Sequence, residues 1–320
     1  MDRLLGRWDA GAVYHLTTVS LTGGVRLVSA NDSEVRIWDL TGTTSGAAAV
    51  ELARSPGEYP GVNGVAVGRL GRDRAVIGVA TEDGVSWWDP ATGREPFPGA
   101  EVGPIWDVAA ASTPDGRVRL FGAAYSKPWP VLCWDAATGQ ELPPIGYHDI
   151  SITAVVAVAL PDHLLVASAD EAGTVRCWDG STASHWPNRS DGVLDGHEDR
   201  VRAMAMADLG GGRLLLATAD MDGTINRWDP VTGDLLGTSS GDDGVAIYQL
   251  HVTLLAGSPQ LISVGADDVI RRWDAITGGL IDESLTGWSA TTSVVDGRPA
   301  LVVGDADGTT INLYELTGLQ

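Results

Sequence analysis

The chain has 320 residues, of which 21 are Lys or Arg and 42 are Asp or Glu, so its formal net charge is −21. Such a chain repels phosphate backbones, which disfavours nucleic-acid binding and favours a basic partner. No apolar run approaches the ~18 residues of a membrane span, and the N-terminus lacks a basic start followed by an apolar stretch, so we expect a cytoplasmic protein without membrane association.

A repeated frame divides the chain into units. The dipeptide Trp-Asp occurs eight times, and in six cases it follows an apolar run, a turn rich in Asp and Gly, and a short alternating segment. A seventh, degenerate copy ends in Tyr314-Glu315. The aromatic residues of these seven copies lie at 38, 88, 134, 178, 228, 273 and 314. One unit therefore recurs every ~40–50 residues, which indicates a repeat architecture.

Each unit predicts four strands, a to d, in the same order. An upstream apolar segment gives strand a, and Asp-Gly, as in Asp83-Gly84, supplies the positive φ angles of a hairpin between strands b and c. A Thr-Gly turn after Trp-Asp leads into strand d in most units. In chain order, the strands a are predicted at 13–19, 62–68, 105–111, 152–158, 201–207, 247–253 and 288–294.

A four-stranded sheet cannot bury both of its faces alone, so we expect an all-β fold in which seven sheets stack in a ring. The single domain covers residues 1–320. Its units lie at approximately 10–57, 58–100, 101–146, 147–192, 193–241, 242–285, and 286–320 together with 1–9.

The last unit runs out of chain after its strand c. Residues 2–6 match residues 234–237, which form strand d of the fifth unit, so we predict that residues 2–8 supply the missing outer strand. This N-terminal strand would close the ring and leave no open edge in the last unit.

On the six in-frame Trp-Asp pairs and the seventh copy, the chain resembles the WD-repeat β-propeller family over essentially its whole length. The resemblance implies a seven-bladed β-propeller of four-stranded antiparallel blades. It also implies a hydrogen-bonded structural tetrad in the fifth blade, made of His197, Thr218, Asp222 and Trp228. In such a tetrad every buried polar group has a partner, so we interpret His197 as structural.

Other blades keep this tetrad only in part. The fourth blade has His148, Ser168 and Trp178, but Ala172 stands at the place expected for the aspartate. The sixth has Ser263, Asp267 and Trp273 but lacks the histidine. We therefore expect the fifth blade to be the most regular.

We expect neither a metal nor a cofactor. The remaining histidines share no ligand spacing with one another or with the cysteines. Cys133 and Cys177 each precede a Trp-Asp in neighbouring blades, which predicts buried free thiols.

Strands a of a propeller surround a central channel, and loops converge on its mouth. If the first apolar residue of each strand a points between blades, alternation points the next residue into the channel. These residues are Tyr14, Asn63, Trp106, Thr153, Arg202, Tyr248 and Ser289, with Asp107 adjacent. Family members that bind peptides at this mouth use the matching positions. Trp129, in the b–c turn of the third unit, is a second predicted contact.

Two classes of function remain open. The first is a non-catalytic scaffold, a monomeric ring or part of a larger complex, that binds a basic peptide or protein at the channel mouth, where Tyr, Trp and Arg are suitable anchors. The second is an enzyme or small-molecule binder that uses the mouth as its pocket, with Asp107, His15 or His251 as acid or base. We favour the scaffold because the sequence contains no complete set of catalytic residues. A separate alternative is that the aromatic residues fill the channel and bind no partner.

Overall fold

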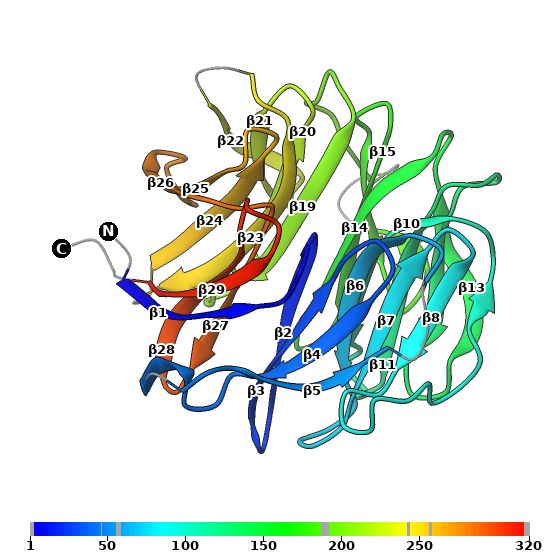
Figure 1. Cartoon of the computed structure of the whole chain (residues 1–320). Helices are drawn as coiled ribbons and strands as arrows, with labels where there is room; N and C mark the ends of the chain where they lie inside the picture. Colours follow the sequence, from blue (N-terminus) through cyan, green and yellow to red (C-terminus); the bar gives the residue numbers. More distant parts are fainter. Residues whose placement is uncertain are drawn as a thin grey trace.

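The computed structural model describes residues 3–45, 47–55, 59–186, 192–241, 244–255 and 258–316. Within these ranges the chain forms seven antiparallel sheets. The sheets stand around a central axis like the blades of a propeller, and the first and last strands lie side by side (Figure 1). The all-β, seven-bladed fold predicted from the repeat is therefore confirmed.

Each blade runs from an innermost strand a to an outermost strand d. The strands a are β2 (His15–Leu21), β6 (Val62–Arg69), β10 (Ile105–Ser112), β14 (Ile152–Ala159), β19 (Val201–Asp208), β23 (Ile247–Leu255) and β27 (Ser289–Val295). The strands b are β3 (Gly24–Ala30), β7 (Ala75–Thr81), β11 (Val118–Ala124), β15 (Leu164–Asp170), β20 (Leu214–Asp220), β24 (Ser258–Gly265) and β28 (Arg298–Gly304).

The outer half of each blade follows the same order. The strands c are β4 (Val35–Asp39), β8 (Gly84–Trp88), β12 (Pro130–Asp135), β16 (Val175–Asp179), β21 (Thr224–Asp229), β25 (Val269–Asp274) and β29 (Thr310–Glu315). The strands d are β5 (Val50–Arg54), β9 (Ala100–Glu101), β13 (Gln140–Tyr147), β17 (Ser184–His185), β22 (Asp234–Ser240), β26 (Leu280–Thr286) and β1 (Arg3–Asp9). A further short strand, β18 (Val193–Leu194), also pairs with β16, and a short 3-10 helix, η1, covers Thr43–Ser45.

The apolar runs that precede the b–c turns form strands b, whose residues are largely buried on both faces of the sheet. Every residue of β20, for example, is buried, because neighbouring blades cover both faces of the sheet. The outer strand β22 of the same blade is largely exposed and carries polar residues. The core therefore consists of apolar layers between adjacent blades, and the tryptophans of the six in-frame Trp-Asp pairs, such as Trp228, lie within those layers.

The N-terminal strand closes the ring. Strand β1 pairs with β29 from Arg3 opposite Glu315 to Asp9 opposite Thr310. Trp8 is buried and its ring centroid lies 6.2 Å from that of Trp38 in the first blade. The prediction that the N-terminus completes the last blade is confirmed.

Five of the strands a begin with a bulge. The register with strand b shifts between the pairs Val62/Gly64, Ile105/Asp107, Ile152/Ala154, Val201/Ala203 and Ile247/Gln249. Each shift inserts one extra residue, which re-aims the side chains on both sides of it. Alternation from the first apolar residue therefore does not hold at the mouth of the channel.

The fifth blade contains a hydrogen-bonded tetrad, but its aspartate is not the predicted one. His197 Nδ1 lies 2.7 Å from Asp220 Oδ2, and its Nε2 lies 2.6 Å from Thr218 Oγ1. Trp228 Nε1 donates to the same hydroxyl at 2.9 Å. Asp222 is exposed in the turn, so its assignment to the tetrad was wrong. The reason is that Asp220 Oδ1 accepts the N–H groups of the turn itself, which fixes the carboxylate at the end of β20.

The fourth blade has the same complete arrangement. His148 bonds Asp170 and Ser168, each at 2.8 Å, and Trp178 Nε1 donates to Ser168 Oγ at 2.8 Å. The expectation that Ala172 removes the aspartate was wrong for the same reason, and the fifth blade is not more regular than the fourth in this respect. In the sixth blade, Trp273 donates to Ser263, while Asp267 pairs with Arg271.

No helix in the described part of the chain is long and apolar enough to span a membrane.

Candidate functional site at the channel mouth

The central channel forms a cavity of about 880 Å³. Its walls come from β2, β6, β10, β14, β19 and β23, together with Trp288 and Asp268 at the mouth. Because these strands belong to different blades, residues far apart in the sequence line the same cavity. Figure 1 shows the strands of the separate blades around the common axis.

Four of the seven predicted mouth positions line this cavity: Tyr14, Asn63, Arg202 and Tyr248. The other three, Trp106, Thr153 and Ser289, are not among the described residues that line it. Thr153 and Ser289 are buried and bond to the next blade, through Val201 O at 2.5 Å and Val13 O at 3.0 Å. Asn63 makes the corresponding bond to Ile105 O at 3.1 Å while it still reaches the cavity. Part of this ring therefore ties neighbouring blades together, at the bulge residues Asn63 and Thr153 and at Ser289, whose strand β27 keeps a regular register.

Two aromatic groups stand at the mouth. Tyr14 stacks on Trp288, with centroids 5.5 Å apart and an interplanar angle of 24°. Trp106 meets the edge of Tyr125 at 5.7 Å, and the Arg202 guanidinium carbon lies 5.9 Å from the Trp106 ring centroid. The Arg202 guanidinium thus lies over the Trp106 ring in a cation–π contact.

Tyr248 stands apart from both groups and is 45% exposed. Together with the stack of Tyr14 on Trp288, it gives the mouth accessible aromatic surface from three blades.

Asp107 lies deeper, at the point where β10 resumes its register after the bulge. Its Oδ1 accepts from the Val108 N–H at 2.8 Å, and its Oδ2 accepts from the Val155 N–H of the next blade at 3.0 Å. Burial raises the pKa of Asp107 to about 6, although these N–H groups and the Arg202 charge act in the opposite direction.

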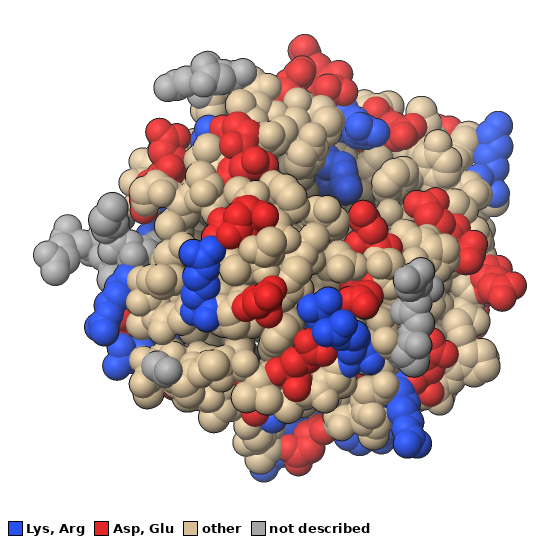
Figure 2. All heavy atoms as spheres, viewed as in Figure 1, with Lys and Arg blue, Asp and Glu red and all other residues tan. Residues whose placement is uncertain are grey.

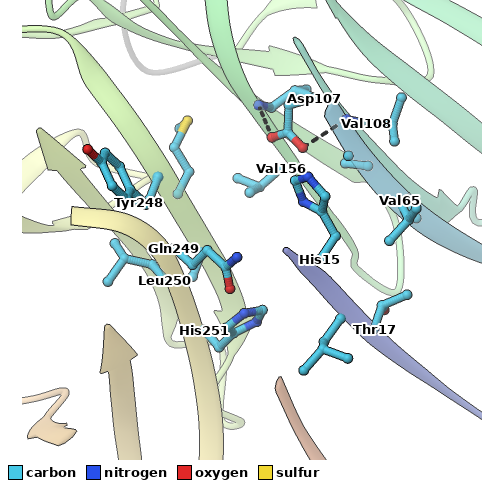
Figure 3. Close-up of a pocket in the computed structure, with 18 of the residues that line it drawn as sticks. His15, Thr17, Val65, Asp107, Val108, Val156, Tyr248, Gln249, Leu250 and His251 are labelled. Carbon is cyan, nitrogen blue, oxygen red and sulfur yellow. Dashed lines mark hydrogen bonds between the residues drawn. The ribbon is translucent and has the colours of Figure 1, made fainter. Parts of the chain in front are cut away.

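His15 and His251 also project into the channel, on different sides of it (Figure 3). Burial lowers the pKa of each imidazole to about 4, and the Arg202 charge adds to this effect at His15. Both rings are therefore neutral at pH 7 and can accept a hydrogen bond at one nitrogen. The three candidate acid–base residues, Asp107, His15 and His251, do share one chamber.

Gln249, which the sequence reasoning did not select, bridges three blades in this chamber. Its Nε2 donates to Tyr14 O at 2.7 Å, and its Oε1 accepts from the Ala290 N–H at 3.2 Å. The amide dipole of a glutamine satisfies a donor and an acceptor at once, but a lone Gln carries no sequence signal of that role.

The b–c turn of the third blade presents a different aromatic from the one predicted. Trp129 is half-buried against the core between the third and fourth blades, with the Lys127 ammonium 5.0 Å from its ring centroid. Tyr125 is 43% exposed and reaches Trp106 at the mouth. Tyr125 and Trp288 are therefore the mouth aromatics that the predicted positions omitted.

Metal-ligating side chains do not gather in the described residues: no three of His, Cys, Asp and Glu come together there as a candidate metal site. Cys133 and Cys177 are buried thiols that are not joined in a disulfide, as predicted.

Seven sheets around a channel, closed by an N-terminal strand, define a seven-bladed β-propeller. Comparison with protein families gives the repeat type: the WD40 family (WD domain, G-beta repeat) matches residues 188–229, the stretch that contains His197, Thr218 and Trp228. The chain thus carries a WD40 repeat within a seven-bladed propeller, an architecture that typically serves as a protein-interaction scaffold. No curated protein matches the chain.

Proposed function

We propose that the chain is a non-catalytic scaffold that binds a peptide or protein segment at the mouth of its channel. The observation that carries this proposal is the grouping of accessible aromatic side chains from separate blades, Tyr14 on Trp288 and Tyr248, around an open cavity. Such residues supply large contact areas at little cost in conformational entropy, and they dominate binding energy at interfaces.

The charge of the surroundings favours a partner that is basic overall. Asp268 lines the mouth, Asp107 lies below it, and Glu82 accepts a hydrogen bond from Asn63 at the rim. Acidic side chains are scattered over the face seen in Figure 2, without a continuous basic patch. A net charge of −21 would accelerate encounter with a basic partner, and added salt would slow that encounter.

A selection of random twelve-residue peptides displayed on phage tests the site. Selected peptides would be titrated by calorimetry into the wild type, the double variant Tyr14→Ala/Tyr248→Ala, and Tyr147→Ala, an exposed tyrosine on the outer strand β13. We expect the double variant to bind at least about tenfold more weakly, because it loses two aromatic contacts, and the control to bind as the wild type does. Equal binding to all three proteins would reject the mouth as the site.

A small-molecule binder or enzyme is the second candidate, and the chamber of Asp107, His15 and His251 is the observation that favours it. Mass spectrometry of the protein after gentle purification and denaturation distinguishes this candidate. A small molecule that is retained by the wild type and lost from His15→Gln would support it over the scaffold.

A further inference from the structure

Arg202 gives the mouth a chemical preference of its own. Resting on the proposed function, we infer that the partner places a carboxylate group, from an Asp or Glu side chain or a C-terminus, on the Arg202 guanidinium. The partner would then be basic overall but anchored by one acidic group.

The first step of the argument is that Arg202 lacks an acceptor. It is the bulge residue of β19, it lines the cavity, and it is only partly exposed. In the described part of the chain, no oxygen accepts a hydrogen bond from its guanidinium and no carboxylate pairs with it within 4.0 Å. Its contact is with the Trp106 ring, which holds the side chain in place and leaves its N–H groups free.

The second step is that Asp107 does not fill this role. Both of its carboxylate oxygens already accept backbone N–H groups, from Val108 and Val155. The Asp107 charge acts on Arg202 only from a distance and raises its pKa. Burial has the larger effect, so the pKa of Arg202 is lowered. The guanidinium has lost part of its hydration, and no acceptor has replaced it. An anion that binds to it therefore stabilises the complex.

The third step is the kind of anion. A guanidinium fork matches the two oxygens of a carboxylate, and the paired N–H···O bonds are charge-assisted. A phosphate group would bring about two negative charges into the cavity that Asp107 and Asp268 also line, so repulsion disfavours it relative to a singly charged carboxylate. Asp107 and Asp268, which line the same cavity as Arg202, repel additional acidic groups, which favours a partner with one such anchor.

A double-mutant cycle tests the inference with the peptides selected above. On the protein side, Arg202→Gln removes the charge; the control is Arg200→Gln, a neighbouring arginine that already pairs with Glu171 at 3.8 Å. On the peptide side, each Asp or Glu is replaced by Asn or Gln, and the C-terminus is amidated. One of these peptide changes should weaken binding to the wild type at least tenfold and have less than twofold effect on Arg202→Gln, while Arg200→Gln behaves as the wild type.

Each other result is decisive. If every peptide carboxylate can be removed without loss, or if its removal weakens binding to Arg202→Gln as strongly as to the wild type, the inference is wrong. Tighter binding of a phosphoserine peptide than of its glutamate counterpart, lost in Arg202→Gln, would replace carboxylate by phosphate as the anchor. Peptides that depend on Tyr14 and Tyr248 but not on Arg202 would overturn the anchor and leave the proposed function standing. Peptides that depend on none of the three would overturn the function itself.

Discussion

The Asp107 carboxylate of the third blade accepts a hydrogen bond from the backbone N–H of Val155 in the fourth blade, at 3.0 Å. Similar bonds join other neighbours along the channel, from Asn63 to Ile105, from Thr153 to Val201 and from Ser289 to Val13. The inner ends of the blades are therefore joined by side chains as well as by packing. Of these side chains, Asp107 is the one that titrates, so the tie between the third and fourth blades depends on pH.

Replacing Asp107 with Asn should change how stability depends on pH. The folded protein holds this proton up to about pH 6, whereas the ordinary value is 3.8, so the unfolded chain releases it first. Stability contributed by this group therefore falls as pH rises from 4 to 6, by roughly 3 kcal/mol in total. Asp107→Asn removes this fall while it keeps one acceptor. Urea unfolding at pH 4.5, 6 and 7.5 measures the effect, with Asp83→Asn as an exposed control. A parallel pH profile for Asp107→Asn and the wild type would refute it.

Replacing His15 and His251 with Gln should make the protein more resistant to acid. Their pKa values are about 4 in the folded state and 6.5 ordinarily, so the unfolded chain takes up protons first as pH falls. The stability they contribute is present above pH 6.5 and is lost between pH 6.5 and 4, by roughly 3 kcal/mol for each ring. The double variant should lose several kcal/mol less than the wild type over this range. His163→Gln, an exposed histidine, should lose as much as the wild type does.

The tetrad of the fifth blade gives a matched pair of substitutions. Asp220→Ala leaves the buried His197 and two turn N–H groups without their acceptor, so we expect a loss of about 2–4 kcal/mol. Asp222→Ala removes an exposed side chain and should change stability by less than about 0.5 kcal/mol. Chemical denaturation of both variants compares them directly. Equal losses would mean that the turn, rather than the carboxylate on His197, carries the energy.

Deleting residues 1–9 should lower the melting temperature by more than about 10 °C, because the deletion exposes the edge of β29 and removes the buried Trp8. Trp8→Ala alone should cause a smaller part of this loss, since the backbone pairing with β29 remains. Differential scanning calorimetry measures both. An unchanged melting temperature for the deletion would show that the ring does not need its closing strand for stability.

The spacing of the six in-frame Trp-Asp pairs and of the seventh copy at Tyr314-Glu315 was sufficient to predict seven blades. Each in-frame pair marks the same place in a blade, where a residue such as Trp228 is buried between sheets, so the length of chain between these pairs is the length of one blade. The match of residues 2–6 to strand d of the fifth blade predicted the closing strand. Both segments form the outermost, largely exposed strand of a blade.

The mouth was harder to predict, because it depends on pairing between strands and on turn geometry. In Ile105-Trp106-Asp107 the apolar pattern suggests plain alternation, but the register with β11 shifts there, so Asp107 lines the cavity and Trp106 supports Arg202. Likewise, Asp222 was predicted as the tetrad aspartate because it belongs to an Asp-Gly turn. The carboxylate that accepts the turn N–H and bonds to His197 is that of Asp220. Both errors are local shifts of one or two residues that hydropathy cannot resolve.

The pairing of β1 with β29 also sets an order of events during synthesis. Arg3 is synthesised about 300 residues before its partner Glu315, an interval of roughly 15–60 s at typical rates of elongation. During that interval the first strand has no native partner, whereas each of the first six blades is built from strands that follow one another along the chain. The nascent chain must therefore keep an apolar segment containing Leu4, Leu5 and Trp8 away from other strand edges until β29 has been synthesised.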